Sequence, residues 1–161
     1  MRKDSRGFSL IELLIVVAII LIIAAIAIPN LLRSRIAANH ASAVGSLRTI
    51  NTAEITYAST YNTGYSTTLD QLGPPATGAT PSLAAAGLID SVLAITKVKS
   101  GYAFAYTPAA AVGGRIEEYT LTAAPSSLNT TGTNFYFTDQ SGVIRVNPGA
   151  AATAASSPLA G

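Results

Sequence analysis

Few side chains in this 161-residue sequence are suited to chemistry, and they do not form catalytic or metal-binding combinations. His40 is the only histidine, and there is no cysteine, which excludes zinc–thiolate, iron–sulfur and thiol chemistry. The serines occur in no Gly-x-Ser-x-Gly turn, and no base is available to activate one of them. We therefore predict no enzyme, no metal and no cofactor, and we assign His40 as a polar residue on a helix.

Glu12 is the acid with the most unusual surroundings, because it is the only charged residue between Phe8 and Ile28. As a helix this stretch is roughly 31 Å long, close to the ~30 Å hydrocarbon thickness of a bilayer, and we predict that it spans a membrane. A carboxylate at that depth costs a few kcal/mol. Since Glu12 has no evident partner in its own helix, we expect it to meet one on another molecule.

The positive charge of the chain belongs to its first seven residues. They hold three of the ten basic and one of the eight acidic side chains, so a chain beginning at Phe8 is formally neutral. We therefore assign no nucleic-acid surface. Gly7 is the one small residue at the sharp boundary before the apolar stretch, and cleavage there would remove the basic leader and keep the span. The basic leader places that end in the cytoplasm and the chain beyond Pro29 outside.

The stretch Gly7-Phe8-Ser9-Leu10-Ile11-Glu12-Leu13-Leu14-Ile15-Val16 resembles the prepilin signature of type IV pilins and of the related pseudopilins of type II secretion. The resemblance implies cleavage after Gly7 by a membrane aspartyl prepilin peptidase and N-methylation of the new Phe8 amine. It also gives Glu12 a role in subunit assembly. Pro29 lies where many members of the family carry a proline that kinks or locally melts the helix.

Electrostatics supports the same assembly role. Cleavage would leave an ammonium on Phe8, and a second subunit displaced along the axis could bring that amine to Glu12. The two charges would then neutralise each other in an apolar filament core. Removing one partner would leave the other buried and unpaired, at about 3–5 kcal/mol. The expected partners are copies of this chain in a helical filament, the prepilin peptidase and N-methyltransferase, the pilus assembly machinery and the cytoplasmic membrane.

The predicted fold is α+β and pilin-type, with one long helix packed against an antiparallel sheet of about four strands. The segments, in order, are a cleaved leader (1–7), a membrane-spanning or filament-core helix (8–29), the outer half of that helix (30–62), a connecting region (63–100), the sheet (101–147) and a flexible tail (148–161). In the connecting region we predict two short helical turns, near Thr67–Leu72 and Ser82–Ile89.

Two further groups of polar residues have alternative interpretations. The segment Asp139-Gln140-Ser141-Gly142 fits a hairpin turn better than the calcium loop that major pseudopilins carry, because Asp139 is its only acid and calcium binds six to eight oxygens. Lys97, Lys99 and Arg115 fit a solvated face better than a basic binding patch.

The function predicted from these features is that of a structural subunit, the major pilin of a type IV pilus-like filament. It would reside in the cytoplasmic membrane before assembly and afterwards in an extracellular filament on a bacterial surface. The alternatives are a pseudopilin of a type II secretion system and a single-pass membrane protein with a ligand-binding head.

Overall fold

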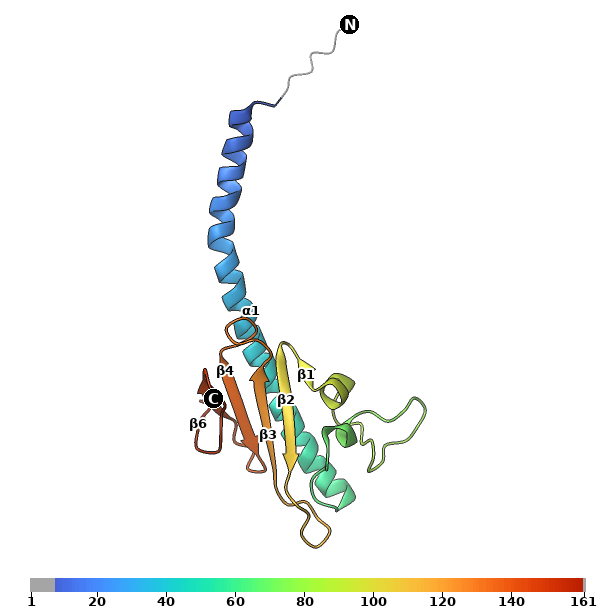
Figure 1. The fold of residues 1–161 in the computed structure, drawn as a ribbon. Coiled ribbons are helices and arrows are strands. Elements are labelled where there is room, and N and C mark those ends of the chain that lie inside the picture. The colour runs from blue at the N-terminus through green and yellow to red at the C-terminus, as the bar shows by residue number, and fades with distance from the viewer. Residues whose placement is uncertain (1–7, 161) are drawn as a thin grey trace. The chain divides into compact units, whose positions relative to one another are not determined.

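The computed structural model describes residues 8–160. Its main helix, α1, runs from Leu10 to Tyr61. The chain divides into a first unit ending at Arg35 and a second unit beginning at Ile36, so α1 contributes to both. All of the strands belong to the second unit (Figure 1). A long apolar helix followed by an antiparallel sheet makes the protein α+β, which confirms the predicted fold class.

The sheet has six strands in sequence order, and every neighbouring pair is antiparallel. The strands are β1 (Val98–Lys99), β2 (Tyr102–Pro108), β3 (Tyr119–Pro125), β4 (Asn134–Asp139), β5 (Arg145–Pro148) and β6 (Ser157–Pro158). The sheet therefore has two strands more than the four expected, namely the short β1 and β6. β1 and β6 contain two residues each, too few to show the alternation from which a strand is predicted.

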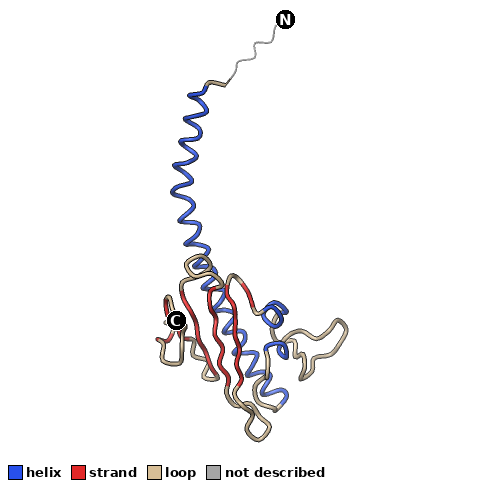
Figure 2. Tube along the Cα trace, viewed as in Figure 1, coloured by secondary structure: helices blue, strands red, loops and turns tan. Residues whose placement is uncertain are grey.

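The second-unit part of α1 packs on one face of this sheet (Figure 2). Its buried apolar side chains recur at steps of three or four residues, the spacing of one helix face; they include Ala43, Leu47 and Ile50. In the strands, alternate residues point to the same side, and β2 and β3 bury such residues in the same core, namely Tyr102, Phe104, Tyr119, Leu121 and Ala123. The buried face of α1 and the buried sides of β2 and β3 therefore form one core.

Glu54 is fully buried in this interface. Its Oε2 accepts a hydrogen bond from the Ser66 backbone N–H at 2.9 Å, and its Oε1 accepts one from the Ser66 hydroxyl at 2.6 Å. The Tyr106 hydroxyl of β2 donates to the Ser66 carbonyl at 2.8 Å. Burial raises the pKa of the Glu54 carboxyl, and the bonds from Ser66 oppose that rise. Glu54 of α1 thus binds Ser66 of the following loop, and Ser66 in turn binds Tyr106 of the sheet.

The connecting region has two short helical turns, at Leu69–Leu72 and Val92–Thr96. The first lies within the predicted Thr67–Leu72, but the prediction for Ser82–Ile89 is wrong. The backbone N–H groups of Ala86 and Leu88 donate to Gln71 and Leu72 carbonyls, both at 2.8 Å, instead of to carbonyls one turn earlier. These longer-range bonds outweigh the helical preference of the alanines.

The expected flexible tail, 148–161, contains an ordered element over its described residues. β6 pairs with β5, and the Arg145 guanidinium donates to the Ser156 carbonyl at 3.0 Å. Leu159 packs against the core, and its N–H donates to the Ile144 carbonyl at 2.8 Å. These anchors are single residues in an alanine-rich segment, so no periodic pattern marks them.

The raised pKa of Glu54 predicts how stability depends on pH. Above the ordinary pKa of 4.5, the folded protein holds the Glu54 proton while the unfolded chain has released it. The free energy of unfolding must therefore fall as pH rises through this window. We expect Glu54→Gln to remove this decline. Thermal melts of the detergent-solubilised full chain from about pH 4 to about pH 8 would measure it. Equal slopes in both proteins would contradict the assignment.

Candidate functional site

The apolar part of α1 is exposed along its whole length. From Phe8 to Leu32 the large hydrophobic side chains are between 41% and 81% exposed. The most apolar 18-residue window has a mean hydropathy of 3.3, and none of it is buried. Length and composition therefore allow this helix to cross a membrane. An apolar surface of this extent needs lipid or another protein chain around it.

Glu12 has a partner in its own helix, contrary to the expectation from sequence. The backbone N–H of Ser9 donates to its Oε2 at 2.8 Å. The Ser9 carbonyl accepts from the N–H groups of Glu12 and Leu13 at 3.1 and 3.2 Å. Ser9 is the N-cap and Glu12 the third helical residue, so the carboxylate side of a capping box is formed. The signal was present in the sequence as Ser-x-x-Glu at the start of the apolar run.

This cap places the carboxylate at the end of α1 where free N–H groups and the helix dipole favour a negative charge. Glu12 nevertheless stays exposed. Among residues 8–160, no donor bonds to its Oε1. The local bond therefore satisfies one carboxylate oxygen and leaves the other open to a second molecule.

The other predicted residues of the N-terminal site lie around this cap. Phe8, 76% exposed, precedes Ser9 directly. Gly7 lies outside the described residues. Pro29 lies inside α1, which continues on both sides of it. Because proline has no N–H, the Ala25 carbonyl cannot receive the usual helical bond from residue 29.

The remaining candidate groups are engaged in the fold. The His40 Nε2 accepts a hydrogen bond from the Thr133 N–H at 3.1 Å, and burial lowers the pKa of its imidazole. The Asp139 Oδ1 accepts from the Ser141 N–H at 2.9 Å, a hydrogen bond that caps a turn. Across residues 8–160, no three His, Cys, Asp or Glu side chains gather as a metal site would require.

The three basic residues suspected of forming a patch are each neutralised. Ion pairs join Lys97 to Asp70 at 3.3 Å, Lys99 to Asp90 at 2.8 Å and Arg115 to Glu117 at 2.8 Å. This pairing agrees with a solvated face.

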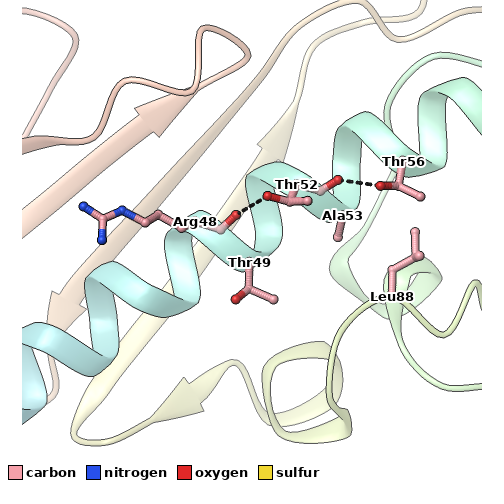
Figure 3. A pocket seen from close by; sticks show the side chains of 6 residues that line it. All are labelled: Arg48, Thr49, Thr52, Ala53, Thr56 and Leu88. Atoms are coloured by element: carbon pink, nitrogen blue, oxygen red, sulfur yellow. Dashed lines mark hydrogen bonds between the residues drawn. The ribbon is translucent and has the colours of Figure 1, made fainter.

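An open groove of about 400 Å³ runs beside α1 in the second unit (Figure 3). The Thr52 and Thr56 hydroxyls on its wall donate to carbonyls of their own helix, at 3.0 and 2.9 Å. Thr49 does the same toward Gly45, at 3.0 Å. With these hydroxyl hydrogens occupied, Arg48 is the charged group that lines this groove.

Comparisons with known proteins support the importance of the N-terminal segment. Residues 2–28 match the family model of the prokaryotic N-terminal methylation motif. The chain is 62% identical over 37 residues to the type IV wide pilus major component PilA4 of Thermus thermophilus. It is 47% identical over 55 residues to the type IV major pilin protein PilA of Myxococcus xanthus. These matches cover 23% and 34% of this chain.

The matched regions span 28% and 25% of the two relatives' own lengths. No solved structure matches the chain. The methylation motif thus lies on the exposed apolar helix, which is followed along the chain by an antiparallel sheet. By this motif and these two matches, the chain is similar to type IV major pilins over part of its length.

Pro29 should weaken the helix locally, and Pro29→Ala should remove that weakness. Alanine restores the bond to the Ala25 carbonyl, a gain of about 3 kcal/mol in a helix interior. Amide hydrogen exchange of the detergent-solubilised chain should then slow across residues 25–32. Ile28→Ala, which leaves the backbone bonds unchanged, is the control. Unchanged exchange in Pro29→Ala would show that α1 has no weak point there.

Proposed function

We propose that this chain is a structural subunit, the major pilin of a type IV pilus-like filament. The observation that carries the proposal is the exposed apolar helix with a single acid in its first turn. Such a helix suits two environments in succession, lipid before assembly and neighbouring helices afterwards. The similarity to two major pilins supports the pilus subunit over the pseudopilin alternative.

Maturation is proposed to occur by cleavage after Gly7 and methylation of the Phe8 amine. The methylation motif over residues 2–28 supports it, and it implies a prepilin peptidase with N-methyltransferase activity as a partner. The mature chain would wait in the cytoplasmic membrane until the assembly machinery withdraws it into the filament.

In the filament, the proposed contact joins the Phe8 amine of one subunit to Glu12 of another. Helix association in lipid gains little from the hydrophobic effect, because the lipid tails are as apolar as the side chains, so packing and polar contacts must supply the specificity. Glu12 suits this role because its Oε1 is open while Ser9 holds Oε2. The pair would fix the axial step between subunits, because neither charge can be left alone in an apolar core.

Gly7→Leu should block maturation, because a bulky side chain replaces the small residue at the cleavage boundary. Mass spectrometry of the membrane-bound protein should then find the intact leader, and no chain should begin at Phe8. Recovery of a mature N-terminus at Phe8 from this variant would refute cleavage at this position.

Glu12→Ala should leave the chain processed and in the membrane but unable to build filaments. It would leave the buried amine unpaired, at about 3–5 kcal/mol. Electron microscopy of sheared surface material, with mass spectrometry of the N-terminus, would measure both outcomes. Ser9→Ala is the matched control, since it keeps the backbone N–H that bonds Glu12 and should assemble normally. Ordinary fibres from Glu12→Ala would exclude the proposed contact.

A further inference from the structure

The acids of the second unit fall into two groups. Asp70, Asp90 and Glu117 form ion pairs within the chain, and Glu54 is buried and hydrogen-bonded. Glu118 and Asp139 remain, and no cation among the described residues pairs with either of them.

These two acids line one groove of about 320 Å³. Asp139 at the end of β4 is the register partner of Thr120 in β3, so both side chains point to the same face of the sheet. Tyr119, between Glu118 and Thr120, is buried toward α1, so Thr120 and Asp139 lie on the opposite, outer face. The groove also has apolar walls from Pro108, Phe137 and Ala154.

Among the described residues, four cations have no acidic partner: Arg145 of β5, whose guanidinium donates to the Ser156 carbonyl, and three arginines on α1. Arg33, Arg35 and Arg48 are all exposed, and within residues 8–160 none of them forms an ion pair. Figure 3 shows Arg48 extending from the helix beside the groove of threonines. We call these three residues the α1 arginines.

We propose that the groove of Glu118 and Asp139 binds a guanidinium from the α1 arginines of a second copy of this chain. The groove suits arginine because a guanidinium donates to two carboxylates through its planar fork and stacks on an aromatic ring such as Phe137. Arg48 cannot reach the groove of its own chain, because α1 and the groove lie on opposite faces of the sheet.

The contact joins two different surfaces, an arginine on α1 and the groove, so it is heterologous, and it leaves one arginine and one groove free at the ends of any assembly that does not close into a ring. Contacts of this kind build open-ended filaments when the rotation between subunits does not close a ring. The inference therefore rests on the proposed filament and adds a contact between its outer domains, separate from the Phe8–Glu12 contact.

The test removes the two charges while keeping the turn. Glu118→Gln with Asp139→Asn preserves an oxygen for the Ser141 N–H, and filament yield from the full-length variant should fall about tenfold. Glu117→Gln is the matched control, because Glu117 is adjacent to Glu118 in the sequence but already pairs with Arg115 within the chain; this variant should assemble normally. Melting midpoints of the solubilised proteins should be alike, which separates loss of contact from loss of folding.

Charge exchange provides the second arm. Glu118→Arg with Asp139→Arg should abolish filaments, and adding Arg33→Glu, Arg35→Glu and Arg48→Glu should restore them. Undiminished yield from the neutral variant, or no restoration by the exchanged charges, would overturn the contact while wild-type filaments still support the proposed function. A wild-type chain that forms no filament would instead refute the proposed function.

Discussion

The hydrogen bond between the Ser9 N–H and the Glu12 carboxylate holds the only charged side chain in the apolar stretch from Phe8 to Ile28. A carboxylate in an apolar span is tolerated only if its charge is compensated. Here the helix supplies part of that compensation through its own first turn. Because the bond occupies one oxygen only, the carboxylate can be accommodated in lipid and still accept a second partner.

The two units of the chain differ in how completely they bury their own surfaces. In the second unit, α1 and the sheet form a common core, and among the described residues no buried side-chain polar atom lacks a hydrogen-bond partner. In the first unit, the apolar side chains remain exposed on all sides of the helix. The second unit can therefore keep its fold while the surroundings of the first unit change.

The features predicted correctly from the sequence are those with a repeating pattern. The long helix is predicted by an unbroken apolar run, followed by apolar residues spaced three or four positions apart. The strands are predicted by alternation of large and small side chains, as in Tyr102-Ala103-Phe104. The misassigned or unpredicted features depend on single contacts: Ala86 bonding to Gln71, Leu159 bonding to Ile144, and the Ser9 cap on Glu12. The cap has the Ser-x-x-Glu motif in the sequence, but the long apolar run around it is the stronger signal and does not mark where the helix begins.

The short strands at the two edges of the sheet restrict how copies of the chain can join. Exposed edge strands invite pairing with further strands and uncontrolled aggregation. Here β1 offers two residues and β6 offers two, of which Pro158 has no N–H to donate. The sheet thus has poor edges for adding strands, which leaves side-chain contacts and helix packing as the routes to association between copies.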